Sequence, residues 1–175
     1  TMSNCNSDGE SWGGAIVNYP GSTGGMLHVE NVTIENAYKN LIDTDLQHVT
    51  ISNVSATFTS SGAAQTGVAL DSAFGTSSDV NIFNFDAPGY SSVTINALGS
   101  INMTEVDVGT ATLAIVPGGS SSTANGPSGD SAIFYDVEAG DMSLTRIQPS
   151  IFNDVTAGHI DISGNAISTD VMTVT

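Results

Sequence analysis

Residues 29–58 decide the fold of this chain, and they read VENVTIENAYKNLIDTDLQHVTISNVSATF. The phrase Val32-Thr33-Ile34-Glu35-Asn36 returns seventeen residues later as Val49-Thr50-Ile51-Ser52-Asn53. Each copy alternates apolar and polar residues, which is the pattern of a half-buried β-strand, and each copy ends on an asparagine. A phrase that returns along the chain predicts a fold built from stacked repeats.

Similar apolar–polar–apolar triplets continue through the chain. Their second apolar residues are Ile34, Ile51, Ile82, Met103, Leu144 and Ile162, spaced 17, 31, 21, 41 and 18 residues apart. The short spacings predict a unit of about twenty residues. The two long spacings contain polar insertions, at residues 59–67 and 117–130. We therefore expect a single domain over 1–175, with the turn-rich residues 1–25 as its N-terminal cap region.

The fold class predicted from these patterns is all-β, because no stretch keeps a 3.6-residue period over three turns. A β-sandwich is one architecture, but its turn signals Asp8-Gly9 and Asn125-Gly126 fall in the most polar segments. A solenoid expects very short strands, insertions confined to turns, and one residue type repeated at one place in each coil. The spacing favours the solenoid, with the β-sandwich as the alternative.

Three asparagines supply such a repeated residue. Asn36, Asn53 and Asn84 each follow their triplet at the same offset. Stacked at the ~4.8 Å spacing of neighbouring strands, their amides are expected to form a hydrogen-bonded structural ladder.

This run resembles the right-handed parallel β-helix of the pectin-lyase-like superfamily, which has interior aliphatic ladders and an asparagine ladder at one turn. The resemblance covers residues 26–116, and it implies a solenoid of about five to six short coils. The pattern departs at Glu105 and Arg146, where asparagine is not found. Because this fold carries lyases, hydrolases, adhesins and spacers, the resemblance implies a fold and no single activity.

The charge of the chain excludes several partners. Eighteen acidic residues face two basic ones, Lys39 and Arg146, for a net charge of −16. Such a polyanion repels phosphate backbones and anionic lipids, so neither nucleic-acid binding nor membrane binding is expected. No apolar run is long enough to insert into a bilayer. The Ser-, Thr- and Gly-rich composition with a single lysine predicts an extracellular or cell-surface location.

The motifs of family enzymes that hydrolyse galacturonan are found only in fragments. Those enzymes resemble one another in an Asn-Thr-Asp, a double Asp, a Gly-His-Gly and an Arg-Ile-Lys motif, in that order. The nearest residues here are Asp43-Thr44-Asp45, Asn153-Asp154, Gly158-His159-Ile160 and Arg146-Ile147-Gln148. The double Asp is missing and Arg146 precedes His159, so no carboxylate pair is set across a scissile bond. The sequence leans against an enzyme and assigns no catalytic residue.

Acidic turns are candidates for calcium, a hard cation that takes oxygen ligands. Asp43 and Asp45 flank one turn, and Asp136, Glu138 and Asp141 crowd another. None matches the twelve-residue calcium loop, and solvated acidic turns are the alternative interpretation.

The function expected is that of a non-catalytic structural or adhesive module that self-associates end to end into a filament or surface layer. The C-terminal strand, with Val171 and Val174 as candidate assembly residues, lacks a visible cap and would offer an open edge. The chain opens on Thr1 and ends on a strand without a terminating turn. It is therefore also expected to be a processed product or a module cut from a longer protein. The alternative is a carbohydrate-binding or polysaccharide-degrading protein, with Trp12, Tyr90 or Tyr135 stacking on a surface glycan.

Overall fold

The computed structural model describes residues 1–3, 14–18, 25–37, 40–44, 46, 48–58, 66–70, 79–97, 100–117, 131–145, 148–163 and 173–174. Within these ranges every regular element is a β-strand and none is a helix, which confirms the all-β class. The strands are β1 (Met2–Ser3), β2 (Gly14–Asn18), β3 (Met26–Glu35), β4 (Asn40–Thr44), β5 (His48–Thr57), β6 (Thr66–Leu70), β7 (Asp79–Asp86), β8 (Ser92–Ala97), β9 (Ser100–Asp107), β10 (Thr112–Pro117), β11 (Ser131–Glu138), β12 (Asp141–Thr145), β13 (Gln148–Thr156), β14 (Ile160–Ser163) and β15 (Thr173–Val174).

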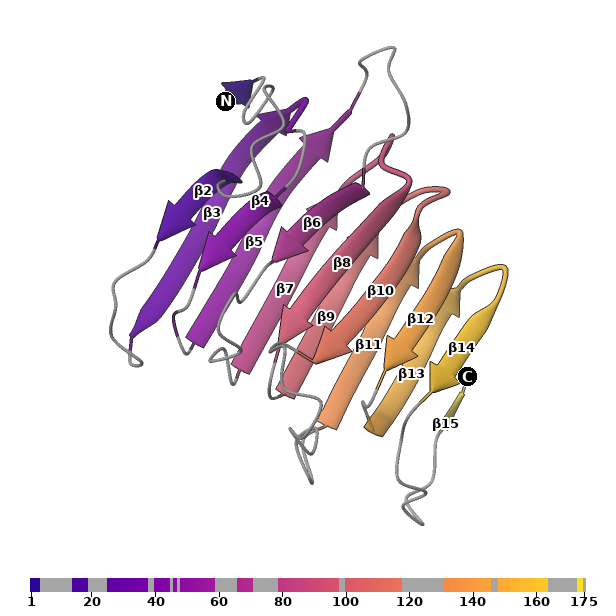
Figure 1. Ribbon diagram of the computed structural model, residues 1–175. Helices are drawn as coiled ribbons and strands as arrows, with labels where there is room; N and C mark the ends of the chain where they lie inside the picture. The colour runs from indigo at the N-terminus through magenta and orange to yellow at the C-terminus, as the bar shows by residue number, and fades with distance from the viewer. Residues whose placement is uncertain are drawn as a thin grey trace.

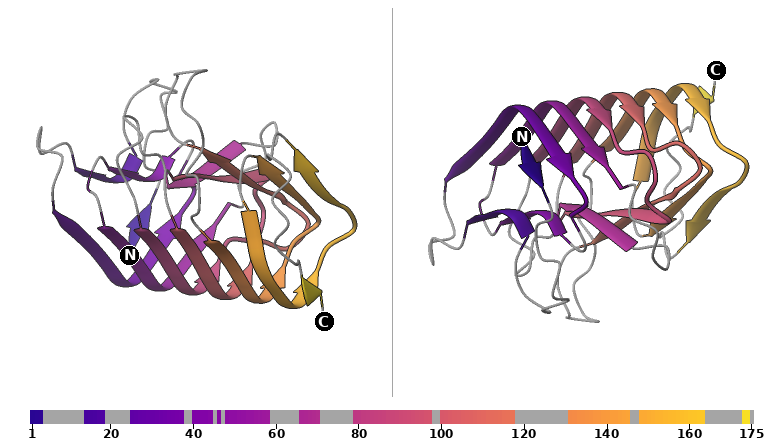
Figure 2. Two further views of the ribbon diagram at one scale, coloured as in Figure 1. Left: turned by 90° about the horizontal axis from the view of Figure 1, so that it is seen from below. Right: turned by 90° about the horizontal axis from the view of Figure 1, so that it is seen from above.

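These strands form two sheets that lie as two layers, one behind the other (Figure 1). The odd-numbered strands make an eight-stranded sheet, here sheet A, and the even-numbered strands make a seven-stranded sheet, here sheet B. The chain therefore alternates between the layers, and each passage adds one strand to each sheet. The two ends of the chain lie at opposite ends of this stack (Figure 2).

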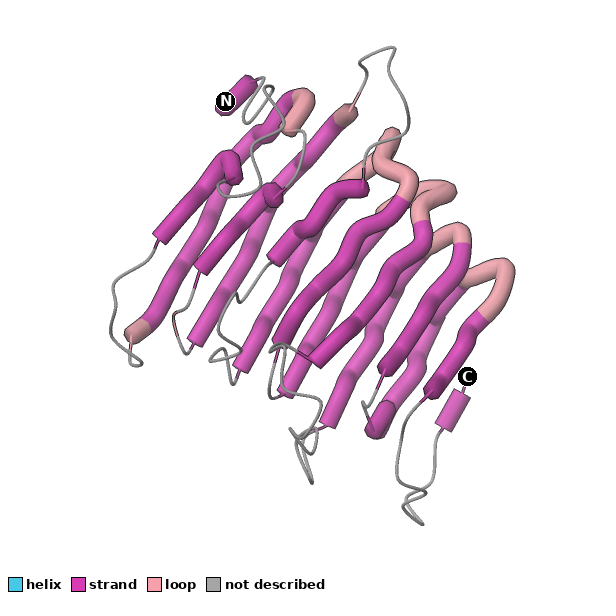
Figure 3. The backbone as a smooth tube through the Cα atoms, viewed as in Figure 1, coloured by secondary structure: helices cyan, strands magenta, loops and turns pink. Residues whose placement is uncertain are grey.

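All the described strand pairs are parallel, whereas the sandwich alternative rests on antiparallel hairpins. Short loops carry the chain from sheet A to sheet B at one side of the layers (Figure 3). Backbone hydrogen bonds join these loops from one rung of the stack to the next: Ala87 donates to Asp107, Val108 to Glu138 and Ala139 to Thr156. The stacking thus continues through the turns as well as the strands.

The core lies between the sheets and consists of columns of apolar side chains. One column in sheet A is formed by residues paired strand by strand and almost fully buried: Val29, Ile51, Ile82, Met103, Phe134 and Phe152. The rings of Phe134 and Phe152 stack with their centroids 5.0 Å apart. Because each inward residue covers the one below it, burial of aliphatic and aromatic surface is the main stabilising contribution.

Each long strand of sheet A contains a bend at one residue with positive φ. Asn31 in β3 and Asn53 in β5 are two of them, with φ of 56° and 51°. At each bend the inward–outward alternation is interrupted, so that two successive residues face solvent before an inward residue returns, as Glu30 and Asn31 do before Val32. The bend therefore divides each strand into two apolar–polar–apolar halves.

The bends correct the repeat expected from the sequence. The register pairs Val29 with Ile51 and Ile34 with Ala56, a return of 22 residues, which agrees with the predicted unit of about twenty but not with the 17-residue equivalence of Ile34 and Ile51. The equivalence of Ile51, Ile82 and Met103 is confirmed, whereas Ile34 belongs to a column beyond the bend. Leu144 and Ile162 pair with each other in sheet B. The physical reason is that the halves before and after a bend look alike in sequence.

The insertions and the cap region fall largely outside the described residues. Residues 59–65 and 118–130 are not described, while Thr66 and Gly67 belong to β6 and Pro117 ends β10. Within 1–25, only β1, β2, Thr1 and Gly25 are described.

Candidate functional site

The bend residues lie in one column along the outside of sheet A, here called the bend column. On neighbouring strands, the residues just before and just after the bend are paired, so the bend residues themselves lie in line. The members of the column are Asn31, Asn53, Asn84, Glu105, Asp136 and Asp154. All six have φ between 49° and 56°, and all six are exposed. Left-handed backbone is strained for most residues, and Asn and Asp tolerate it best after Gly. The backbone conformation thus selects short polar side chains that project outward.

The asparagine half of the column forms a hydrogen-bonded ladder. Nδ2 of Asn84 donates to Oδ1 of Asn53 over 2.9 Å, and Nδ2 of Asn53 donates to Oδ1 of Asn31 over 3.2 Å. An amide can do this because it carries both donors and an acceptor.

The ladder includes Asn53 and Asn84 from the predicted set, and the register places Asn31 in it instead of Asn36. Asn36 lies five residues beyond the bend, just after β3 ends. It also has positive φ, 53°, and its backbone N–H donates to the carbonyl of Thr57 over 2.8 Å. Asn36 therefore turns the chain at a different corner.

Two shallow hollows, here together called the bend groove, lie beside this column on the outer surface of sheet A. Its first part is mostly uncharged and is lined by Asn31, Val32, Thr33, Asn53, Val54, Ser55, Asn84 and Asp86. Its second part is lined by Glu105, Val106, Asp107, Asp136 and Glu138, four of which are acidic. The groove therefore changes from neutral amides and hydroxyls to carboxylates along its length.

Asp86 lines the first part, and its neighbour across the sheet, Asp107, lines the second. Its Cα neighbours across the sheet are Ser55 on one side and Asp107 on the other. Burial, and then the like charge of Asp107, raise the pKa of Asp86 above its ordinary value of 3.8, while a hydrogen bond with Ser55 acts in the opposite direction. The protonation of Asp86 therefore responds to the acidic half of the groove.

Two exposed aromatic residues lie next to the bend column in sequence. Phe83 and Tyr135 directly precede bend residues, and Thr104 lies between them in the register. Phe83 is 37% exposed and Tyr135 is 50% exposed. At ~4.8 Å per strand the two positions are about 9.6 Å apart. Their rings offer apolar surface on an otherwise polar face.

The other aromatic residues singled out from sequence have different positions. Tyr90 is only 3% exposed, and its hydroxyl donates to the carbonyl of Ala37 over 3.2 Å, so it supports the core and offers no stacking surface. Trp12 lies outside the described residues.

Of the predicted calcium ligands that the structure describes, Asp136 and Glu138 line the same part of the groove, whereas Asp141 lies in the other sheet. Asp136 and Glu138 lie on β11 in sheet A, and Asp141 begins β12 in sheet B. Asp45 and the side chain of Asp43 lie outside the described residues. Among those described, no group of three or more His, Cys, Asp or Glu side chains is placed to hold a metal ion. Calcium binding stays a prediction.

The enzyme-like fragment Asp43-Thr44-Asp45 contains a structural residue. Thr44 is fully buried, and its Oγ1 accepts a hydrogen bond from the backbone N–H of Leu46 over 3.2 Å. A hydroxyl that closes a local turn in this way is typical of Thr at the end of a strand.

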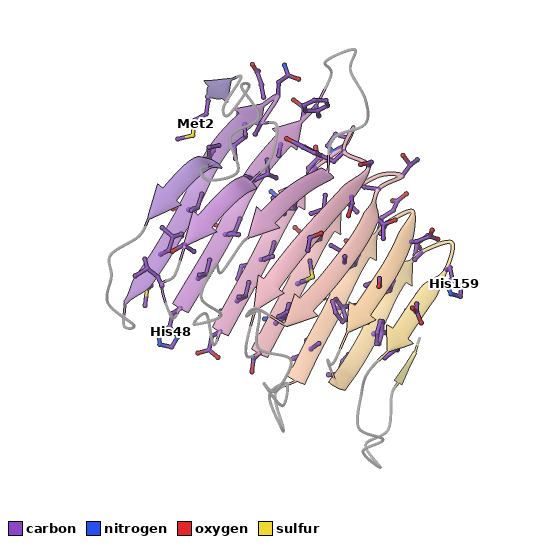
Figure 4. All side chains as sticks on the ribbon, in the orientation of Figure 1. Met2, His48 and His159 are labelled. Atoms are coloured by element: carbon purple, nitrogen blue, oxygen red, sulfur yellow. The ribbon has the colours of Figure 1, made fainter. Side chains whose placement is uncertain are left out.

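His159 lies exposed after β13, at the far end of the stack from Met2 (Figure 4).

The ends of the stack are the places where the core is least covered. Among the residues whose side chains the structure describes, the apolar residues that pack on the core but remain partly exposed lie in the two terminal rungs: Ala15, Ile16, Leu27 and Val32 at one end, and Val155, Ala157, Ile160 and Ile162 at the other. Of the predicted assembly residues, Val174 lies in β15 at the edge of sheet A, and Val171 falls outside the described residues.

In the described ranges, no helix has the length and apolarity needed to cross a membrane.

No family model, curated protein or solved structure matches this chain.

Proposed function

We propose that the chain is a right-handed parallel β-helix module that serves as a non-catalytic structural or adhesive element outside the cell and associates end to end. The alternation of the chain between two parallel sheets supports the solenoid. The right-handed sense follows from the strong preference of parallel crossover connections for that hand. The likeness to the pectin-lyase-like superfamily belongs to this proposal.

The observation that carries the proposed function is the partial exposure of the described core residues at the two ends of the stack. Ile16 is such a residue at one end and Ile162 at the other. An exposed apolar strand edge is a template for another chain. The described bend residues on the outer face of sheet A are by contrast polar or charged. Association through the ends would therefore bury partly exposed core residues.

The charge of the chain sets the conditions for this association. With a net charge of −16, two copies repel one another at low ionic strength. Salt screens that repulsion within about 10 Å at 0.1 M, while burial of apolar surface is unaffected. An extracellular or cell-surface site, where ions are abundant, is part of the proposal.

Sedimentation velocity on the concentrated protein, combined with negative-stain microscopy, tests this function. We expect monomer at low salt and elongated oligomers at high salt. A sedimentation coefficient of monomer under every salt condition would reject end-to-end association.

The calcium prediction is tested in the same series, by comparing the heat of binding and the Tm in calcium and in sodium at equal ionic strength. If calcium gives no extra heat of binding and no extra rise in Tm, the calcium prediction is rejected.

A second candidate function, glycan binding, is favoured by Tyr135 and Phe83 beside the bend groove. Aromatic faces that stack on sugar rings and nearby amides or carboxylates that bind hydroxyls are the usual components of such a site. The Tyr135→Ala variant should then lose binding on a glycan array. The Tyr90→Phe variant is the matched control, because Tyr90 is buried. Equal binding by the wild type and the Tyr135→Ala variant would reject this candidate.

A further inference from the structure

Exposed apolar side chains gather at one place on the outer face of sheet A, over the neighbouring strands β11 and β13 in the rear layer of Figure 1. On β11, Ile133 and Tyr135 alternate with the fully buried Phe134, so both point outward. Ile151 on β13 pairs with Ile133, and it is 44% exposed. Ile151 and Tyr135 are diagonal neighbours, within reach of an aromatic side chain. Ile133, Tyr135 and Ile151 therefore form one apolar patch, here called the β11 patch.

The β11 patch is bordered by carboxylates on three successive strands. Together β9, β11 and β13 contain no lysine, arginine or histidine. Their acidic residues, all exposed, are Glu105, Asp107, Asp136, Glu138 and Asp154. The patch is therefore an apolar surface with negative charge along one side.

The bend in β11 is what brings the two chemistries together. In a regular strand, successive residues point to opposite faces of the sheet. At the bend, Tyr135 and Asp136 are both exposed, because Asp136 has a φ of 54° and interrupts the alternation. On the next strand, Thr104 pairs with Tyr135, and Glu105 directly follows it. An aromatic ring and two carboxylates thus share one stretch of the outer face.

The charge of this surface decides what can cover it. A second copy of the chain would bring the same carboxylates face to face, and like charges at an interface oppose association. Phosphate backbones and anionic lipids are repelled for the same reason. Lysine and arginine side chains are attracted. The aliphatic surface of Ile133 and Ile151 suits an apolar side chain better than the hydroxyls of a sugar.

We propose that the β11 patch docks a basic segment of another protein, which places an apolar side chain on Ile133, Tyr135 and Ile151 and basic side chains on Asp136 and Glu105. The proposal rests on the proposed adhesive function and names the chemistry of its partner. The apolar contact and a cation held over the ring of Tyr135 supply the affinity. The exposed carboxylates steer the approach of the partner and make binding depend on salt.

Isothermal titration calorimetry with a synthetic peptide tests this docking. The probe has a central tryptophan, two lysines on each side of it and glycine spacers. We expect measurable heat of binding to the wild-type chain at low ionic strength, and a Kd that rises as salt is added. Two control peptides carry serine in place of the tryptophan or glutamate in place of the lysines, and both should bind at least about tenfold more weakly.

Tyr135→Ala tests the apolar contact, and we expect the Kd for the peptide to rise about tenfold. Met26→Ala is the matched control. Met26 is 71% exposed, but it lies on β3, away from the β11 patch, so its loss should leave the Kd unchanged.

Asp136→Asn tests the charge without disturbing the bend, because asparagine tolerates left-handed backbone as well as aspartate does. We expect the Kd to rise about threefold at low salt, and less at high salt. Glu35→Gln, which removes one charge from β3, is its control and should change the Kd little. An unchanged Tm of the Asp136→Asn variant checks that its fold is intact.

The outcomes separate this proposal from the proposed function. No heat with the lysine–tryptophan peptide at low salt, or equal binding by the wild type and the Tyr135→Ala variant, would overturn the docking. Equal binding of the tryptophan and serine peptides would reduce it to general attraction between opposite charges and overturn it as well. Glycans that bind the wild type and not Tyr135→Ala, in the absence of peptide binding, would assign the patch to the second candidate function. Monomer throughout in sedimentation would reject end-to-end association and leave the docking standing.

Discussion

The two halves of the bend column have the same backbone but different chemistry. Asn31, Asn53 and Asn84 share positive φ with Glu105, Asp136 and Asp154. The amides form hydrogen bonds from strand to strand, whereas ionised carboxylates have only acceptors and repel each other when stacked. The same geometry is therefore a stabilising ladder in one half and a line of unscreened charge in the other. Only the second half carries charges whose repulsion salt can screen.

The largest expected effect comes from breaking the ladder at its centre. Asn53→Ala loses both hydrogen bonds of Asn53, at ~0.5–1.5 kcal/mol each, and puts Ala in the left-handed region at a cost of ~1–2 kcal/mol. We expect a loss of about 2–5 kcal/mol in the free energy of unfolding, measured by denaturant titration. Asn53→Gly, which accepts positive φ, should lose roughly half as much. Equal losses in the two variants would show that backbone strain plays no part.

Extending the ladder into the acidic half should have a smaller effect of opposite sign. Glu105→Asn replaces a long side chain in left-handed backbone with one that favours it, and supplies an amide donor facing Oδ1 of Asn84. We expect a gain of about 1–2 kcal/mol, seen as a higher midpoint of unfolding. Glu105→Gln removes the same charge but keeps the long side chain. If both variants gain equally, the charge of Glu105 and not its backbone conformation is the cause.

Removing one charge beside the column should stabilise the acidic half slightly. Asp107 lies directly opposite Asp86 on one strand and Glu138 on the other. Asp107→Asn should gain ~0.2–1 kcal/mol at low salt, and less at high salt. Glu35→Gln is the matched control, because it removes one charge but pairs only with Ser3 and Thr57. Equal Tm shifts for the two variants would attribute the gain to net charge alone.

The smallest effect is the pH dependence due to Asp86. Because its pKa is raised in the folded state, by burial first and then by Asp107, the folded protein binds this proton more tightly than the unfolded chain does. The contribution of Asp86 to stability therefore rises as pH falls through its folded pKa towards 3.8, and it is lost again as pH increases. Calorimetric Tm measured against pH should show this, and the Asp86→Asn variant should show a flatter curve. Identical curves would contradict the assignment.

The sequence pattern predicted the strands well and their register poorly. Alternating apolar residues correctly indicated strands around Ile51, Ile82 and Met103, and insertions were expected in the two long spacings. The triplet Val32-Thr33-Ile34 looks like Val49-Thr50-Ile51, yet the first lies beyond a bend and the second before one. One left-handed residue resets the alternation, so similar triplets occur on both sides of it. A linear pattern contains no mark of which side is which.

The bend column was recognisable only in part from sequence for the same reason. Asparagine at a constant offset revealed Asn53 and Asn84, but the wrong return period replaced Asn31 with Asn36. Glu105, Asp136 and Asp154 were missed as members because they share a backbone conformation and not a residue type. An apolar–polar–polar–apolar break in the alternation marks Asn31, Asn53, Glu105 and Asp154, whereas the aromatic residues Phe83 and Tyr135 interrupt that pattern before Asn84 and Asp136.

The sequence by itself determined the all-β class, the inward apolar positions and the excess of negative charge, because each depends on residue type and local periodicity. Only the tertiary structure decided which residues stack on which. Stacking places Asp86 opposite Asp107, and it places Asp136 and Asp141 in different sheets. These relations join residues far apart in the chain, and they follow from strand register, which local sequence does not encode.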